Sequence, residues 1–179
     1  MSMEEKQNSQ TSLDFNQNIF KPSSRDEIIE IVKNCYRKNI PLEINGLKSK
    51  NKIGRNFQSE KTLDLSAYKG IIDYKPEELY IKVKAGTPLK EIVEELDKNN
   101  QQLAFEPNDF GYLFSGESNC GSIGGVVSCN FAGSRRFKVG SVRDHILGFQ
   151  GINGKGETIK SGGTVVKNVT GYDLSKLIS

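Results

Sequence analysis

Two glycine-bearing turns carry the residue types and spacing best suited to holding a ligand. The first spans residues 45–50, with the sequence Asn-Gly-Leu-Lys-Ser-Lys, and follows an apolar stretch that is typical of a strand. Successive backbone amides in such a turn form a concave anion site, which a hydroxyl and lysine charges strengthen. The turn therefore suits a phosphate or pyrophosphate, although an ordinary solvated turn before the basic run that ends at Arg55 explains the same residues.

The second turn spans residues 121–125, with the sequence Gly-Ser-Ile-Gly-Gly, and lies where a helix is predicted to begin. Free amides and the helix dipole favour anions at such a point. Each of the adjacent glycines costs about 1 kcal/mol in a helix relative to alanine, so something must approach the backbone closely. That neighbour is either a flat ligand or a packed strand, and the sequence leaves both open.

The remaining chemistry-bearing side chains predict no catalytic or metal site. The three cysteines, Cys35, Cys120 and Cys129, are odd in number and widely spaced, which favours reduced thiols over disulfides or a metal pair. His145 is the only histidine, and within the apolar stretch from Val142 we expect a packed or edge residue rather than a base. These side chains therefore identify no catalytic residue.

Hydrophobic periodicity predicts the elements that must position the two turns. Ser24 and Glu27 form a capping box before a helix that buries apolar residues between 28 and 35. Thr87 and Pro88 are predicted as the N-cap and first residue of a second helix. Short strands, then longer strands with two helices, indicate the α+β class with two subdomains. Strands are predicted at 40–45, 62–65, 70–74, 79–85, 102–105, 142–153 and 157–161, with a hairpin turn at 154–156, and further helices at 123–130 and from Leu174.

Composition excludes several classes of protein. With 179 residues, 35% hydrophobic and 26% charged, the chain is of folded rather than disordered type. A net charge of +3 gives no case for nucleic-acid binding. The polar N-terminus is no secretory signal and no stretch is apolar enough to span a bilayer, so we expect a cytoplasmic protein. No Gly-x-Gly-x-x-Gly joins a strand to a helix, which argues against nicotinamide binding.

The order of motifs resembles the PCMH-type FAD-binding domain shared by vanillyl-alcohol oxidases, D-lactate dehydrogenases and glycolate oxidase. The matching pieces are Pro22-x-Ser24-x-x-Glu27, the two turns, Gly86-Thr87-Pro88, Gly140-Ser-Val-Arg-Asp144, Ile152-Asn-Gly-x-Gly156, Gly162-Gly163 and Lys167-Asn-Val-Thr-Gly-Tyr-Asp173. The combination of Arg135-Arg136, the Gly140–Asp144 segment and the last of these motifs is narrower and resembles the FAD-binding subunit of bacterial glycolate oxidase. The resemblance implies an FAD-binding domain over residues 19–179, and the polar residues 1–18 before it are expected to form a flexible lead. That domain would be C-terminally incomplete, without the last strands and the cap domain.

The resemblance also implies a function and a site. The activity would be oxidation of a 2-hydroxy acid such as glycolate through noncovalent FAD. The alternatives are an assembly subunit with a degenerate site or a D-lactate dehydrogenase-like flavoenzyme. Expected partners are a larger catalytic flavoprotein and an iron–sulfur subunit, through which the protein could reach the inner membrane. Implied cofactor-binding residues are Asn45, Gly46, Leu47, Lys48, Ser49, Lys50, Pro107, Gly121, Ser122, Gly124, Gly125, Gly140 and Ile152.

The first turn departs from the family pattern at three positions. Asn45 stands where the family usually has a basic residue, and Leu47 and Lys48 replace its second and third glycines. A non-glycine residue forced to positive φ is strained by about 1–2 kcal/mol. The charge of Lys48 offsets such a loss if the ligand is an anion.

Overall fold

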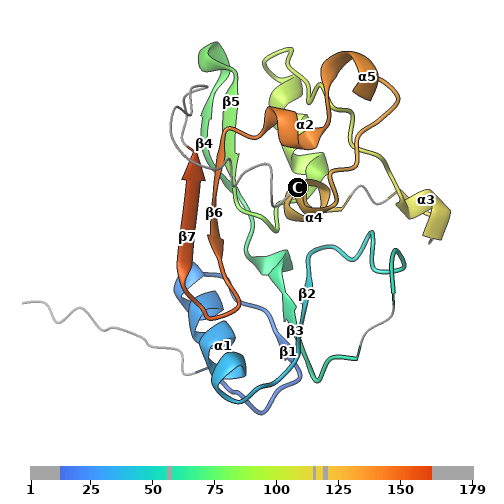
Figure 1. The fold of residues 1–179 in the computed structure, drawn as a ribbon. Helices are drawn as coiled ribbons and strands as arrows, with labels where there is room; N and C mark the ends of the chain where they lie inside the picture. Colours follow the sequence, from blue (N-terminus) through green and yellow to red (C-terminus); the bar gives the residue numbers. More distant parts are fainter. Residues whose placement is uncertain (1–12, 56–57, 115, 119–120, 163–179) are drawn as a thin grey trace, which may run out of the picture.

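The computed structural model describes residues 13–55, 58–114, 116–118 and 121–162, and shows a mixed α+β fold (Figure 1). The predicted helix from Leu174 and the motif at 167–173 lie outside these ranges. The elements, in order, are β1 Ile19–Phe20, α1 Arg25–Arg37, β2 Leu42–Asn45, β3 Lys61–Asp64, η1 Leu65–Ala67, β4 Ile71–Lys75, η2 Pro76–Glu78, β5 Tyr80–Val83, α2 Leu89–Asp97, α3 Gly111–Phe114, α4 Ile123–Cys129, α5 Arg136–Val139, η3 Val142–His145, β6 Gly148–Ile152 and β7 Thr158–Gly162.

The N-terminal part is a three-stranded parallel sheet in the order β1-β3-β2, with α1 packed beside it. The predicted cap of α1 is confirmed, because the Ser24 hydroxyl accepts a hydrogen bond from the Glu27 amide. In a capping box the Glu27 carboxylate would accept from the amide of the N-cap residue Ser24. Here it accepts from the amide of Ser23, one residue earlier, at 2.8 Å. The buried face of the helix joins the sheet in one core, formed by Phe20, Ile28, Ile31, Cys35 and Leu63.

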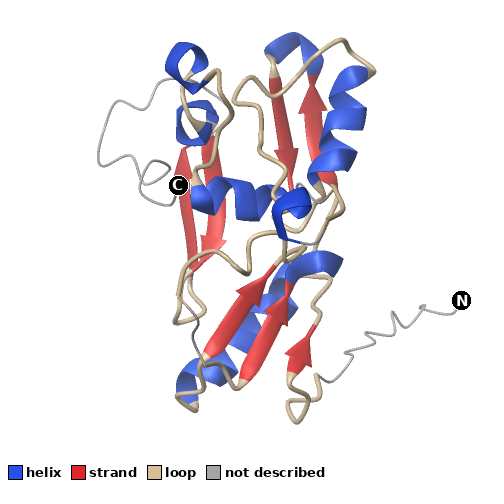
Figure 2. Ribbon diagram, turned by 90° about the vertical axis from the view of Figure 1, so that its right-hand side faces the viewer, coloured by secondary structure: helices blue, strands red, loops and turns tan. Residues whose placement is uncertain are grey.

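The second part contains the β4–β5 and β6–β7 antiparallel hairpins with α2 and α4 (Figure 2). Its core is a separate cluster of Leu89, Ile92, Leu96, Phe105, Val126 and Val142. The predicted hairpin turn at 154–156 is confirmed, because β6 and β7 pair antiparallel on either side of it, with Ile152 opposite Thr158. The two cores explain the two-subdomain pattern of the sequence, and the predicted fold class is confirmed. Among the described residues, no helix has both the length and the apolar character to cross a membrane.

Three predicted elements are wrong in kind or extent. Residues 102–105 form no strand; Phe105 is apolar because it fills the second core, and the chain turns there with Glu106 at φ +47°. The strand predicted from Val142 begins at Gly148, because a capped short helix, η3, precedes it. Thr87 does not cap α2, which starts one residue later than expected at Leu89.

Candidate functional site

The turn between β5 and α2 fixes the start of α4. The Leu89 amide donates to the Gly121 carbonyl at 2.9 Å, and the Ile123 amide donates to the Thr87 carbonyl at 3.0 Å. The Thr87 hydroxyl is fully buried and donates to the Lys84 carbonyl at 2.6 Å. Buried backbone bonds of this kind hold the second predicted turn in one position.

The two predicted turns pack against each other through two glycine–serine pairs. A Cβ atom on Gly46 would overlap the hydroxyl of Ser122, and one on Gly121 would overlap the hydroxyl of Ser49. Both serines are buried, with exposed fractions of 4% for Ser122 and 9% for Ser49. Gly121 also has φ +82°, a conformation that favours glycine. The reciprocal packing brings together segments about 75 residues apart in the sequence.

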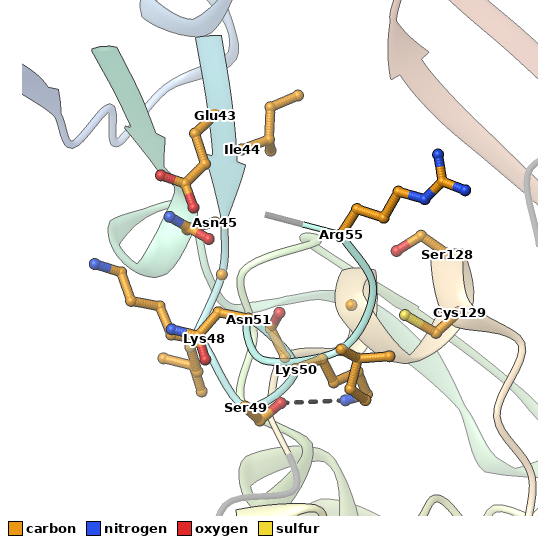
Figure 3. Close-up of a pocket in the computed structure, with 15 residues that line it drawn as sticks. Glu43, Ile44, Asn45, Lys48, Ser49, Lys50, Asn51, Arg55, Ser128 and Cys129 are labelled. Atoms are coloured by element: carbon orange, nitrogen blue, oxygen red, sulfur yellow. Dashed lines mark hydrogen bonds between the residues drawn. The ribbon is translucent and has the colours of Figure 1, made fainter. Parts of the chain in front are cut away.

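An open cleft of about 390 Å³ lies where these segments meet (Figure 3). Lys48, Lys50 and Arg55 bring positive charge to it, against the single carboxylate of Glu43. Backbone amides of a turn and a surplus of cations favour an anionic ligand. The lining residues are Glu43, Ile44, Asn45, Gly46, Leu47, Lys48, Ser49, Lys50, Asn51, Ile53, Arg55, Ser122, Gly125, Ser128 and Cys129.

Lys48 occupies the position where the sequence departs from glycine, and its backbone is in the left-handed region at φ +55°. Its charge acts on Asp64, a buried carboxylate at the end of β3 that pairs with Asn45 in the sheet register. Burial would raise the pKa of Asp64. Hydrogen bonds from Ser66 and the nearby Lys21 and Lys48 charges outweigh burial and lower that pKa. Asp64 is therefore held in its charged form beside the turn.

Lys50 is held in a defined position at the floor of the cleft. Its Nζ donates to Ser49 Oγ at 3.1 Å (Figure 3) and lies 5.7 Å from the centre of the Phe110 ring. A cation–π contact of this kind is worth about 0.5–1 kcal/mol or more. The charge is thus partly preorganised toward the turn rather than spread over freely rotating conformers.

The adjacent glycines of α4 have different neighbours. A Cβ atom on Gly124 would lie 2.9 Å from the carbonyl oxygen of Ala85, to which the Gly124 amide donates. Gly125 would meet only Ser122 Oγ, at an ordinary 3.6 Å, and it lines the cleft. Close packing against the strand end therefore explains Gly124, and a surface kept bare on the cleft side explains Gly125.

Eight of the thirteen predicted residues line the cleft, with Gly121 directly behind Ser49. Pro107, Gly140 and Ile152 lie outside its lining. Ile152 packs on the N-terminal core instead, and the Cβ position of Gly140 faces Asp144. Their contacts with FAD stay predictions. The lining residues that sequence reasoning missed as site residues are Glu43, Ile44, Asn51, Ile53, Arg55, Ser128 and Cys129.

The sequence contained one signal for part of this missed set, because the apolar Ile44 directly precedes the first turn. In the structure Ile44 lies near the end of β2 with 65% of its surface exposed. Ser128 and Cys129 lie one turn of helix beyond Gly125, on a face that the sequence alone did not orient. His145, expected in a strand, lies in η3 with its ring 5.6 Å from that of Phe105.

The fold and the cleft define a flavin-binding class of protein. The chain belongs to the FAD-binding domain family, whose model matches residues 17–162, and FAD is the cofactor of that family. Glycolate oxidase subunit GlcE of Escherichia coli (strain K12) is 40% identical over 151 residues, which cover 84% of this chain and 41% of GlcE. D-Lactate dehydrogenase of Anaerostipes hadrus is 28% identical over 87% of this chain and 31% of its own length.

Solved structures give the same fold. An alkyldihydroxyacetonephosphate synthase superposes with a TM-score of 0.70 over 89% of this chain and 28% of the synthase, at 19% identity. The chain spans about two fifths of the length of GlcE and less of the other relatives. The cleft fits the anionic centre of FAD, because its bare glycine surface and its three cations suit a diphosphate.

Proposed function

We propose that this chain binds FAD as the flavin-binding portion of a 2-hydroxy-acid oxidoreductase of the glycolate oxidase type, with the FAD diphosphate in the cleft between residues 45–55 and α4. The observation that carries the proposal is the reciprocal packing of Gly46 on Ser122 and Gly121 on Ser49 beneath a cationic opening. The 40% identity to a glycolate oxidase subunit supports the substrate class.

The residues of the cleft would bind and orient the cofactor. Turn amides and Ser49 or Ser122 hydroxyls would donate to diphosphate oxygens, with Lys48 and Lys50 adding charge. Gly125 would let the cofactor lie close to the helix backbone. Bound FAD supplies the acceptor for the hydride that leaves the 2-hydroxy acid as it becomes a 2-oxo acid. No thiol or histidine lies in the turn at 45–50, which supports noncovalent binding.

The test is flavin content followed by substrate reduction of the flavin. The purified protein is denatured, and released FAD is measured against protein; a ratio near one without covalent flavin is expected. The holoprotein is then mixed anaerobically with glycolate or D-lactate, and bleaching of the flavin absorbance is followed. Faster bleaching by glycolate supports the glycolate oxidase type, whereas faster bleaching by D-lactate favours a D-lactate dehydrogenase-like enzyme. A protein that neither contains nor takes up FAD refutes the proposal.

We also propose that the protein works in a complex. The relatives include GlcE and a glycolate oxidase subunit GlcD of Bacillus subtilis (strain 168), 27% identical over 89% of this chain. A larger catalytic flavoprotein subunit and an iron–sulfur subunit are the proposed partners. The proposed location is the cytoplasm, at the inner membrane where those subunits attach, and the proposed role is glycolate catabolism.

One observation favours a second candidate function, an assembly subunit with a degenerate FAD site. Lys48 holds a left-handed backbone at φ +55°, where glycine carries no strain, and Leu47 replaces the other glycine. Restoring glycine at both positions separates the candidates. A large gain in FAD affinity supports a degenerate site, whereas an equal or weaker affinity supports a turn adapted to FAD.

A further inference from the structure

The short helix α5 is an exposed element that contributes nothing to either core. None of its four residues, Arg136–Val139, is buried, and the side chain of Phe137 is fully exposed. A large aromatic side chain left entirely in water forgoes the stabilisation that burial gives, and a contact that covers it would recover that stabilisation. Packing within the part of the chain that the structure describes therefore gives no reason for Phe137.

The neighbouring chain nevertheless fixes α5 at both ends. Before it, the Arg135 guanidinium lies 3.6 Å from the Glu106 carboxylate. After it, His145 Nε2 lies 2.9 Å from the Val139 carbonyl, and Asp144 accepts from both the amide and the hydroxyl of Ser141. An element held rigid while burying nothing is preorganised, which lowers the entropy lost on binding a partner.

The charges of α5 are uncompensated on the described part of the chain. Arg136 and Lys138 flank Phe137, and neither has an ion pair with another described residue. We call Arg136, Phe137 and Lys138 the basic knob. Arginine and aromatic residues are the types most enriched at binding hot spots.

A second exposed surface has the opposite charge. Leu79 follows η2 with 77% of its surface exposed and a left-handed backbone at φ +56°. It therefore combines backbone strain of about 1–2 kcal/mol with an unburied apolar side chain. Glu77 and Glu78 precede it, both exposed and without an ion pair among the described residues. We call Glu77, Glu78 and Leu79 the acidic tip.

The basic knob and the acidic tip lie toward the same end of the molecule, with η2 at the top of the β4–β5 hairpin and α5 also near the top but apart from it in both views (Figures 1 and 2). We propose that two copies of this chain associate through these surfaces, with the basic knob of each copy on the acidic tip of the other. A two-fold axis between the copies forms both contacts at once. This inference does not rest on FAD binding or on the proposed activity.

Charge and apolarity match across the proposed contact. Arg136 and Lys138 meet the two glutamates, and Phe137 meets Leu79, which buries both exposed apolar side chains. Rim charges of this kind steer association and are screened by salt. The dimer is therefore expected to weaken as ionic strength rises.

The test is sedimentation velocity of the full chain over a range of concentrations. The wild type is expected to show a reversible monomer–dimer equilibrium that shifts to monomer with added salt. Phe137→Ser and the single reversals Arg136→Glu and Glu78→Arg are each expected to raise the dimer dissociation constant about tenfold or more. The double variant Arg136→Glu with Glu78→Arg is expected to restore dimerisation, because the attraction is re-formed with the charges exchanged.

A matched control is Tyr36→Ser, which removes a half-exposed aromatic side chain from α1 at the other end of the molecule. It should leave the dissociation constant unchanged. Circular dichroism establishes whether each variant is folded. If Phe137→Ser does not fold, the comparison of Arg136→Glu and Glu78→Arg with their double variant still tests the proposed contact. A wild type that stays monomeric, higher assemblies without a dimer, or a double variant that fails to re-associate overturns the proposal.

Discussion

Gly124 and Gly125 are neighbours in one helix, yet the structure predicts opposite effects for their replacement by alanine. Gly125→Ala places a methyl group in the cleft with only an ordinary contact, at 3.6 Å from Ser122 Oγ. The helix gains up to about 1 kcal/mol, because alanine replaces glycine. The unligated protein should therefore become slightly more stable.

The same methyl group occupies space in the cleft that the proposed FAD site requires. Overpacking by one methyl group typically costs about 1–3 kcal/mol, which corresponds to a dissociation constant between about fivefold and more than a hundredfold higher. Gly124→Ala should have the opposite effect on stability. Its Cβ would lie 2.9 Å from the Ala85 carbonyl oxygen and 3.0 Å from the Ala85 Cβ, so it should lower the free energy of unfolding by up to about 2 kcal/mol after the helix gain.

The assay is a pair of measurements on each variant. Urea unfolding of the cofactor-free protein gives the free energy of unfolding, and quenching of FAD fluorescence on titration gives the dissociation constant. Glu30→Ala, an exposed substitution in α1 that lies outside the cleft lining, is the control for general effects of mutation. The reasoning is refuted if Gly125→Ala leaves FAD affinity unchanged, or if the two glycine variants have the same effect on stability.

Three further predictions concern the first turn and the N-terminal core. Lys48→Gly should relieve about 1–2 kcal/mol of backbone strain yet raise the FAD dissociation constant and reduce its salt dependence, as measured by titration at several salt concentrations; tighter binding would contradict an adapted turn. Because the pKa of Asp64 is lowered on folding, its stabilisation is complete above its unfolded-state pKa of about 4 and is lost as pH falls through the folded-state pKa. Asp64→Asn should therefore flatten the fall of unfolding free energy in acid, and an unaltered pH profile would count against this role. Ser24→Ala should cost about 1 kcal/mol of unfolding free energy by removing the α1 cap, whereas no measurable loss in urea unfolding would show that the cap is not stabilising.

The local signals of the sequence predicted most of the elements but not their junctions. The cap at Ser24 and the apolar stripe of α1 depend on neighbours within one helix turn, so they were readable. Phe105 was misassigned to a strand, since an apolar run reads alike whether it joins a sheet or fills a core. Thr87 has the side chain of an N-cap, but its hydroxyl donates to the Lys84 carbonyl and accepts a hydrogen bond from the amide of Gly70, which is distant in the sequence.

In the candidate site, too, the sequence predicted the local features but not how they are arranged in space. The sequence predicted both glycine turns as anion sites, because glycine density and helix starts are local features. It could not place them together, since that depends on the packing of Gly46 on Ser122 and of Gly121 on Ser49, which are far apart in the sequence. The sequence also could not predict the different roles of Gly124 and Gly125, because they differ in that Ala85 packs against Gly124 and not against Gly125.

The location of FAD in the cleft is tested most directly by cysteine protection. Cys129 is exposed and lines the cleft, whereas Cys35 is buried in the N-terminal core, where burial raises the pKa of its thiol. The protein is treated with a thiol-alkylating reagent with and without saturating FAD, and the rate at each cysteine is read by peptide mass spectrometry. FAD is expected to slow the labelling of Cys129, whereas riboflavin, which lacks the diphosphate, is expected to leave it unchanged. Tight FAD binding with an unchanged rate at Cys129 would place the cofactor elsewhere and contradict the account.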